Sequence, residues 1–199
     1  MERQRFSDKL IGWYTERKRD LPWRKTKDPY RVWLSEIILQ QTRVEQGLPY
    51  YQKFTTTYPT VYDLASADEQ EVLRLWQGLG YYSRAINLHK TAKKIVDLNH
   101  GVFPQTYERI LQLKGIGPYT AAAISSFCFG EERPVVDGNV FRFASRFFGI
   151  KEDIAKAKTR KVFEGILHDY IKGVDPGVFN QAIMEFGATV CTPSPKCEE

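Results

Sequence analysis

The sequence is short of cysteine and of long hydrophobic runs, and each shortage excludes a class of protein. Its 199 residues include only three cysteines, too few for the disulfide framework of a small secreted domain. No stretch approaches the ~18 apolar residues of a membrane-spanning helix. The first five residues, Met1–Arg5, lack the apolar segment of a secretory signal. We therefore expect a soluble cytoplasmic protein with no membrane partner.

Alternating β-strand patterns, internal repeats and low-complexity tracts are also missing. Hydrophobic spacing predicts helices over residues 30–41, 84–98, 119–129 and 178–188. Asp28-Pro29 and Asp175-Pro176 each place a capping residue and a proline at a helix start. Ser66 to Glu69 predicts a capping box for the helix that ends at Trp76. Because 42% of the residues are apolar and can form a core, the predicted fold class is all-α.

Basic residues outnumber acidic ones, and the excess is concentrated in one part of the chain. There are 29 Lys and Arg against 24 Asp and Glu, which gives a net charge of +5. Residues 1–31 hold ten basic and five acidic side chains and so account for the whole excess. Residues 84–114 add six basic against two acidic side chains. Clustering of this kind fits a nucleic-acid footprint and solvated helix faces equally well, so both interpretations stay open.

A glycine-rich turn joins two predicted helices at Leu113–Pro118. It places Gly115 and Gly117 where the backbone has to turn tightly. The amide groups of such a turn, with the N-terminus of the next helix behind them, can bind a DNA phosphate without reading a base. The alternative is an ordinary helix C-cap followed by a turn.

Two acidic residues are candidates for chemistry. Glu36 lies among apolar neighbours within a predicted helix, a setting that favours the protonated carboxyl group of a general acid. Asp137 precedes a predicted helix that continues through Arg146, and its carboxylate would stay ionised and face a developing positive charge. The alternatives are a solvent-facing glutamate without a role and a plain N-cap.

Six motifs in one order resemble the adenine DNA glycosylases of the MutY type, in the helix-hairpin-helix glycosylase superfamily. They are Leu21–Arg24, Trp33–Thr42, Gly78–Tyr82, Leu113–Ala121, Val136–Val140 and Phe179–Ala182, spread over essentially the whole chain. The resemblance implies a monofunctional base-excision-repair enzyme that removes adenine mispaired with 8-oxoguanine or guanine from double-stranded DNA. It implies a monomer in the bacterial cytoplasm, associated with the nucleoid. It also implies two helical lobes flanking a DNA-binding cleft. The first lobe is a six-helix barrel at about 22–125, with its hairpin at 113–120, and the second lobe consists of about 1–21 plus 126–199.

The same resemblance implies a role for each motif residue. Glu36 would protonate adenine, Asp137 would stabilise the oxocarbenium-like sugar, and Tyr119 and Asn139 would support this catalytic centre. The adenine pocket would be formed by Arg19, Leu21, Trp23 and Gln181. DNA contacts are implied for Arg24, Gln41, Thr42, Leu79, Tyr81, Gly115 and Gly117. Aromatic and aliphatic side chains among these suit a wedge between bases, and amides suit reading of base edges.

Tyr119 distinguishes this sequence from the related endonuclease III branch of the superfamily. In the endonuclease III branch, a lysine at this position attacks the sugar as an amine nucleophile, and this chain has tyrosine instead. Thymine-mismatch glycosylases also carry tyrosine there, but the context of Glu36 favours the adenine branch. Two alternatives stay open: a catalytically inactive helix-hairpin-helix DNA-binding fragment, and an endonuclease III-type glycosylase of other base specificity.

The iron–sulfur motif implied by the resemblance is interrupted. The family has four cysteines, spaced Cys-x6-Cys-x2-Cys-x5-Cys, that bind a [4Fe–4S] cluster. Cys191 and Cys197 are candidate ligands, but five residues separate them and no cysteine follows; Cys128 lies in another segment. Because the cluster needs four thiolates, we expect the parent protein to bind it and this chain to hold it incompletely or not at all. The family's C-terminal Nudix-like domain is absent too, which predicts weaker selectivity for 8-oxoguanine.

Overall fold

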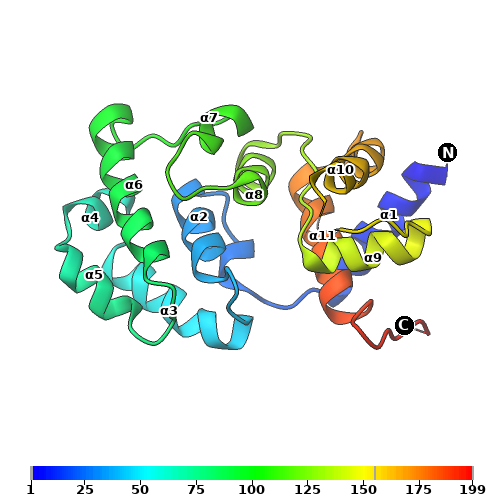
Figure 1. The fold of residues 1–199 in the computed structure, drawn as a ribbon, viewed down its shortest axis with the longest axis horizontal. Coiled ribbons are helices and arrows are strands. Elements are labelled where there is room, and N and C mark those ends of the chain that lie inside the picture. The colour runs from blue at the N-terminus through cyan, green and yellow to red at the C-terminus, as the bar shows by residue number, and fades with distance from the viewer. Residues whose placement is uncertain (1, 155, 199) are drawn as a thin grey trace. The chain divides into compact units, whose positions relative to one another are not determined.

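The computed structural model describes residues 2–154 and 156–198. Over this part of the chain it contains eleven α-helices, one short 3-10 helix and no strand, so the predicted all-α fold class is confirmed (Figure 1). No helix among the described residues is both long and apolar enough to span a bilayer. The chain divides into two compact units, which we call the central unit (Pro22–Ile124) and the terminal unit (Met1–Leu21 with Ser125–Glu199).

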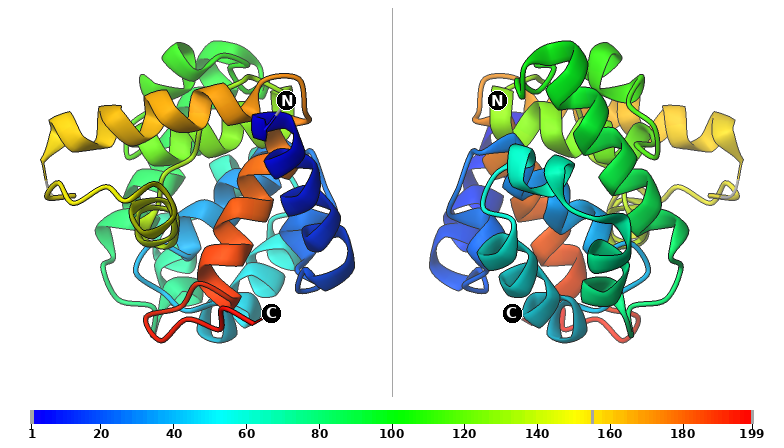
Figure 2. Two further views of the ribbon diagram at one scale, coloured as in Figure 1. Left: turned by 90° about the vertical axis from the view of Figure 1, so that its right-hand side faces the viewer. Right: turned by 90° about the vertical axis from the view of Figure 1, so that its left-hand side faces the viewer.

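The central unit has a core of aromatic and aliphatic side chains. Its elements are the 3-10 helix η1 (Pro22–Arg24), α2 (Pro29–Ile38), α3 (Val44–Thr57), α4 (Val61–Ser66), α5 (Glu69–Trp76), α6 (Ser83–Asn99), α7 (Tyr107–Leu111) and the first turns of α8 (Pro118–Phe129). Helix α6 contacts α2, α4 and α5 (Figure 2, right). Trp33, Phe54 and Trp76 are fully buried, and Phe54 packs edge-on against Trp76 with ring centroids 5.7 Å apart. Burial of three large rings fixes the helices that carry them.

The terminal unit is organised around α11. It contains α1 (Glu2–Arg17), the end of α8, α9 (Gly138–Phe148), α10 (Ala157–Ile171) and α11 (Pro176–Thr189). Helix α11 contacts α1, α9 and α10, and Figure 2 (left) shows α1 alongside it. Its apolar stripe, Phe179, Ala182 and Ile183, is fully buried at helical spacing. Residues on α11 are therefore placed by packing against three other helices.

The predicted starts of α2 and α11 are confirmed. The Asp28 carboxylate accepts a hydrogen bond from the Tyr30 amide, and the Asp175 carboxylate accepts one from the Val178 amide. A proline follows each cap. Helix α2 ends at Ile38, three residues before the predicted end, because the chain leaves the helical conformation and reaches a positive φ at Gln41.

The predicted capping box at Ser66 is wrong. Ser66 is the last residue of α4, so its backbone is helical and cannot also serve as the extended N-cap residue of α5. Asp68 caps α5 instead and accepts a hydrogen bond from the Gln70 amide. A capping box does form one helix earlier, between Thr60 and Asp63 at the start of α4.

His89 on α6 makes folding sensitive to pH. The side chain is 1% exposed, and its Nε2–H donates to the Ala67 carbonyl oxygen at 3.0 Å. Burial lowers the pKa of His89 below its usual 6.5, and the nearby Lys93 lowers it further. Since the unfolded chain then takes up a proton at a higher pH than the folded chain, this contribution to stability is present above pH 6.5 and is lost as the pH falls below it.

We therefore expect the free energy of unfolding to decrease below pH 6.5 by up to about 1.4 kcal/mol per pH unit from this group. His89→Gln can still donate to the Ala67 carbonyl and should flatten the slope, as measured by urea unfolding between pH 5 and 7.5. His168→Gln, on a half-buried histidine of α10, is the matched control and should retain the slope. A His89→Gln protein with the native slope would show that another group titrates.

Candidate active site and nucleic-acid interface

Glu36 is a buried carboxyl group on α2 of the central unit. It is 8% exposed, and every residue from Val32 to Ile38 on the same helix is buried as well. The solvent-facing alternative for Glu36 is therefore wrong. A carboxyl group in such surroundings needs a hydrogen-bonding partner or stays protonated, because burial disfavours its charged form.

The glycine turn between α7 and α8 is tied to α6 in the same unit. Gly115 has a φ of +80°, and a Cβ added there would lie 2.8 Å from the Cβ atom of Asn87, so glycine is required. The Thr91 hydroxyl donates to the Lys114 carbonyl oxygen at 2.8 Å. Tyr119 is the second residue of α8 and is half-buried. The turn is thus held in one conformation, as a backbone that grips a phosphate requires.

Two short loops of the central unit carry four of the predicted DNA contacts. We call them the Gln41 loop (residues 39–43) and the Tyr81 loop (residues 78–82). Gln41 and Tyr81 have φ values of +54° and +45°, and left-handed backbone costs a non-glycine residue about 1–2 kcal/mol. Gln41 is exposed, Thr42 is half-buried, and the Tyr81 side chain is 66% exposed. Leu79, predicted to wedge into DNA, is 6% exposed, so its side chain packs inward in this structure.

Trp23 and Arg24 lie on η1 at the start of the central unit. Trp23 is buried and packs edge-on against Tyr51, with ring centroids 5.2 Å apart. Arg24 is half-buried. The indole therefore belongs to the core of this unit as well as to the predicted adenine pocket.

A small polar cavity of about 90 Å³ lies in the central unit, next to the hairpin turn. It is lined by Trp33, Ile37, Gln40, Ser83, Arg84, Asn87, Leu88, Lys114 and Gly115. Trp33 Nε1 and Arg84 Nε are buried and have no protein partner. A cavity of this size with two such donors can hold ordered water molecules.

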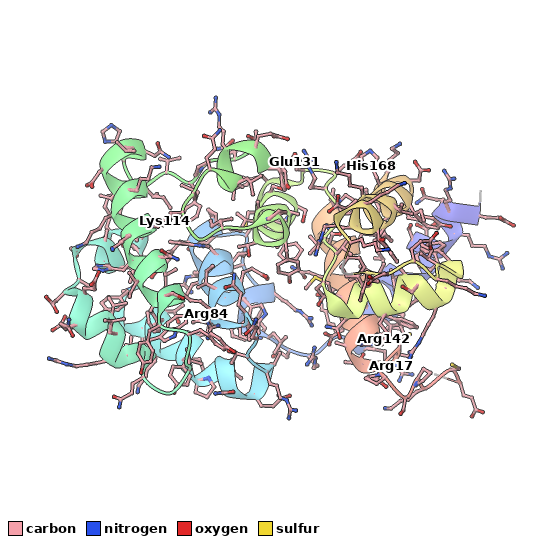
Figure 3. The ribbon with its side chains drawn as sticks, in the orientation of Figure 1. Arg17, Arg84, Lys114, Glu131, Arg142 and His168 are labelled. Atoms are coloured by element: carbon pink, nitrogen blue, oxygen red, sulfur yellow. The ribbon has the colours of Figure 1, made fainter. Side chains whose placement is uncertain are left out.

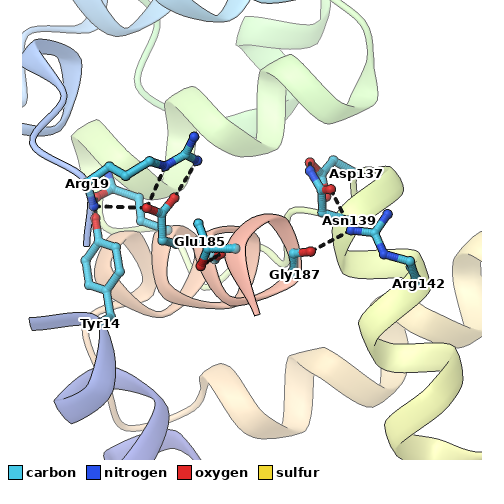
Figure 4. Close-up of polar contacts among 9 residues, drawn as sticks. Tyr14, Arg19, Asp137, Asn139, Arg142, Glu185 and Gly187 are labelled. Carbon is cyan, nitrogen blue, oxygen red and sulfur yellow. Dashed lines mark hydrogen bonds and ion pairs between the residues drawn. The ribbon is translucent and has the colours of Figure 1, made fainter. Parts of the chain in front are cut away.

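Asp137 is the N-cap of α9 in the terminal unit. Its Oδ1 accepts from the Val140 amide at 2.7 Å, and its Oδ2 accepts from the Asn139 side-chain amide at 2.9 Å (Figure 4). The N-cap role is therefore real, and it leaves the half-buried carboxylate oriented by two donors.

Arg142, which the sequence did not single out, connects Asn139 to the segment after α11. Its guanidinium donates to the Asn139 side-chain oxygen at 2.9 Å and to the Gly187 carbonyl oxygen at 2.5 Å (Figure 4). It also donates to the Cys191 carbonyl oxygen at 2.8 Å. A Cβ added to Gly187 would lie 2.7 Å from the Asn139 carbonyl oxygen. The position of Asn139 therefore depends on a close approach of α11 to α9.

The predicted adenine-pocket residues of the terminal unit are held by partners on two helices. Arg19 donates to the buried Glu185 carboxylate from Nε at 2.8 Å and from Nη2 at 2.7 Å, and its backbone amide adds a bond at 3.0 Å. The Tyr14 hydroxyl donates to the Gln181 side-chain oxygen at 2.7 Å (Figure 4 shows Arg19, Glu185 and Tyr14). Leu21 is buried. Much of the hydrogen-bonding capacity of Arg19 is thus used within the protein.

Arg19→Met should lower the free energy of unfolding by about 3 kcal/mol, because it removes a bidentate partner from a carboxylate that is 0% exposed. Urea unfolding measures the loss. Arg17→Met, at the exposed end of α1, is the matched control and should change stability by less than about 0.5 kcal/mol. The double variant Arg19→Met with Glu185→Met should recover most of the loss; a double variant less stable than Arg19→Met would contradict a dominant role for this ion pair.

The cysteines do not provide a set of cluster ligands. Cys191 is buried and its sulfur accepts from Arg146 at 3.4 Å, Cys197 is exposed, and Cys128 is half-buried on α8. Among the described residues there is no group of three or more side chains that could hold a metal ion. Three cysteines in the sequence fall short of the four thiolates that a [4Fe–4S] cluster requires. No catalytic step is therefore assigned to a cluster.

Several functional side chains were missed by sequence reasoning for a common reason. Arg84, Arg142 and Glu185 each have at least one partner 40 or more residues away in the sequence, and for the two arginines these distant partners are mostly backbone carbonyls that no side-chain pattern reveals. Glu185 gave one signal, a charged residue in the apolar run of α11 one turn after Gln181. Figure 3 labels Arg84 and Arg142, one in each unit.

A family model described as HhH-GPD superfamily base excision DNA repair protein matches residues 34–168, more than half of the chain. The chain belongs to this superfamily. The matched span includes Glu36, the hairpin turn and Asp137. It excludes Arg19 and Gln181, so those assignments rest on other similarity.

Individual members of the superfamily are similar over nearly the whole chain. The human adenine DNA glycosylase is 44% identical over 98% of this chain, which covers 37% of that protein. The adenine DNA glycosylase of Buchnera aphidicola subsp. Acyrthosiphon pisum is 40% identical over 96% of this chain, which covers 55% of that protein. The chain thus spans between about a third and a little over half of the relatives it matches.

Solved structures of the superfamily have the same fold. The structure of a thermostable thymine-DNA glycosylase matches with a TM-score of 0.89 at 29% identity, covering 99% of this chain and 91% of that one. A non-covalent endonuclease III–DNA complex matches with a TM-score of 0.80 at 20% identity, covering 99% and 91%, a likeness of fold alone. The helix-hairpin-helix glycosylase fold predicted from the motifs is confirmed.

Proposed function

We propose that this chain is the catalytic core of an adenine DNA glycosylase, which removes adenine opposite 8-oxoguanine or guanine in double-stranded DNA. One observation carries the proposal: a buried glutamate and an oriented aspartate occur in a chain 44% identical to the human adenine DNA glycosylase over 98% of its length. Two carboxyl groups in unlike environments are what hydrolysis of a glycosidic bond requires.

Glu36 is the general acid of this mechanism. The target adenosine leaves the base stack, since its glycosidic bond is out of reach within the duplex. The protonated Glu36 carboxyl group gives its proton to N7 of adenine, which turns the base into a neutral leaving group as the C1′–N9 bond breaks. The buried position of Glu36 supports this role, because it favours the protonated form before the reaction.

Asp137 stabilises the positive charge that develops on the sugar. The bonding electrons leave with adenine, and the oxocarbenium-like sugar faces the Asp137 carboxylate, with or without a transient covalent bond. Water then adds to C1′ and loses a proton, which leaves an abasic site. Asn139 keeps the carboxylate in place through its bond to Oδ2.

The remaining site residues bind substrate. We assign the hairpin turn (Gly115, Gly117) and Arg24 to the DNA backbone, and the Gln41 and Tyr81 loops to the duplex around the target. We assign Arg19, Leu21, Trp23 and Gln181 to the binding of adenine. Tyr119 occupies the position of a lyase nucleophile and supports the catalytic centre, so the enzyme is monofunctional.

The setting of the enzyme follows from the same proposal. It acts as a monomer on mispaired DNA in the bacterial cytoplasm. The central and terminal units are the two lobes of the glycosylase.

Four duplexes test the proposal: they contain an A:8-oxoguanine, an A:guanine, a T:guanine or a matched A:T pair. Excision in each duplex is measured as strand cleavage after alkali treatment. We expect cleavage at adenine in the first two only, and no covalent adduct after borohydride reduction. Thymine excision would favour the second candidate, a thymine-mismatch glycosylase, because the chain is similar to a solved thymine-DNA glycosylase at 29% identity. Strong borohydride trapping would reveal an amine nucleophile and contradict a monofunctional enzyme.

A further inference from the structure

Arg84, the second residue of α6, binds the main chain of both loops that carry the predicted DNA contacts of the central unit. Its Nη1 donates to the carbonyl oxygens of Ile37 and Ile38, each at 3.1 Å, and to the carbonyl oxygen of Gln40. It also lies 3.5 Å from the Thr42 hydroxyl. Its Nη2 donates to the carbonyl oxygens of Leu79 at 3.2 Å and Gly80 at 3.3 Å. One guanidinium group therefore joins the end of α2 and the Gln41 loop to the Tyr81 loop.

Aromatic rings hold the same guanidinium in place. Its central carbon lies 5.1 Å from the centroid of the Trp76 ring and 5.8 Å from that of Tyr81, within the range of a cation–π contact. The Trp76 indole N–H donates to the Gly80 carbonyl oxygen at 3.0 Å and adds a second tie to the Tyr81 loop. Burial lowers the pKa of Arg84, although an arginine remains charged at neutral pH.

Both loops have a conformation that needs external support. Gln41 and Tyr81 adopt left-handed backbone, which neither side chain favours, and both side chains are exposed and gain little from packing. Helix α2 also ends here, and the carbonyls of Ile37 and Ile38 belong to its last turn, which lacks intrahelical donors. A guanidinium at this point donates hydrogen bonds to those carbonyls, and its positive charge interacts favourably with the negative end of the helix dipole.

We propose that Arg84 is a positioning residue that fixes the Gln41 loop and the Tyr81 loop in one shared geometry before DNA binds. This inference rests on the proposed function, in which both loops enter the duplex beside the target base. Because the geometry is already set, DNA binding does not have to order the two loops. The residue acts through the loops and does not touch the reacting atoms.

The planar guanidinium group, with its several N–H donors, is essential to this role. A lysine would place one ammonium group among carbonyl oxygens from two segments, and it lacks the planar face that stacks on Trp76. Arg84→Lys therefore keeps the charge and loses the bridge, whereas Arg84→Met loses both. Arg74→Met, on the exposed last turn of α5, removes a charge from the same unit without touching either loop.

Amide hydrogen exchange of the full chain without DNA tests the bridge itself. In Arg84→Lys and Arg84→Met, we expect the Thr42 and Leu79 amides, which donate to Leu39 and Trp76, to exchange about tenfold faster or more. Amides in the middle of α3 and α5 should be unchanged, and Arg74→Met should resemble the native chain. Native exchange rates in both loops, or faster exchange throughout the central unit, would overturn the proposal.

Excision kinetics test the consequence. With a fluorescent 2-aminopurine next to the target adenine, both Arg84 variants should show slower base flipping at saturating protein, whereas Arg74→Met should not. If the Arg84 variants have faster-exchanging loop amides but still flip and excise the base at native rates, the positioning role is overturned. If the native chain excises no adenine, the proposed function fails, and the exchange experiment still decides whether Arg84 fixes the loops.

Discussion

Glu36→Gln is expected to slow adenine release by about 10²- to 10⁴-fold, the range that a positioned general acid supplies. Glutamine has nearly the same shape and can keep hydrogen bonds in the buried site on α2, but it has no proton to give to adenine. Single-turnover kinetics on an A:8-oxoguanine duplex measure the effect. Binding of the same duplex should stay within about twofold, because Glu36 acts in the transition state and not in duplex binding.

Glu71→Gln is the matched control for this change. It makes the same substitution on an exposed position in the first turn of α5, in the same unit, and should leave the rate unchanged. If Glu36→Gln releases adenine at the native rate, Glu36 is not the acid, and the assignment of its role is wrong.

Asp137→Asn is expected to reduce the rate by about 10²- to 10³-fold with little change in stability. Asparagine is as good an N-cap as aspartate, so the bond from the Val140 amide to Oδ1 can be kept. What is lost is the negative charge that faces the developing oxocarbenium ion, together with the hydrogen bond from the Asn139 side-chain amide to Oδ2. Asp137→Ala should lose the same rate and also about 1 kcal/mol of unfolding free energy, because it removes the cap as well.

Asp175→Asn separates capping from chemistry. Asp175 caps α11 with the same geometry, accepting from the amide three residues on at 3.0 Å. The substitution should therefore leave both rate and stability close to native. Equal rates for Asp137→Asn and the native chain would reduce Asp137 to the plain N-cap that the sequence also allowed.

The helical fold could be predicted because its signals are local. The Asp-Pro pairs at positions 28 and 175 mark the starts of α2 and α11, and apolar spacing marks the buried face of α11. The error at Ser66 arose where two capping signals lie within one short stretch. Which of them is used depends on where α4 ends, a matter of packing against α6.

The supporting contacts of the candidate site could not be predicted from local patterns. Arg19 pairs with Glu185 at a sequence separation of 166, and Arg84 reaches carbonyls up to 47 residues away. The positive φ of Gln41 and Tyr81 is equally hidden, since neither residue type favours it. The motifs predicted the site residues themselves, and their catalytic roles stay predictions.

Release of free adenine is the most direct test of the central claim, that this chain is a glycosylase for mispaired adenine. The 199-residue chain is incubated in excess over a duplex with one A:8-oxoguanine pair, and the free base is measured by chromatography over time. We predict one adenine released per duplex in a single exponential phase, together with one abasic site. If the duplex is bound but no adenine is released, the chain binds DNA without catalysis and the central claim is contradicted.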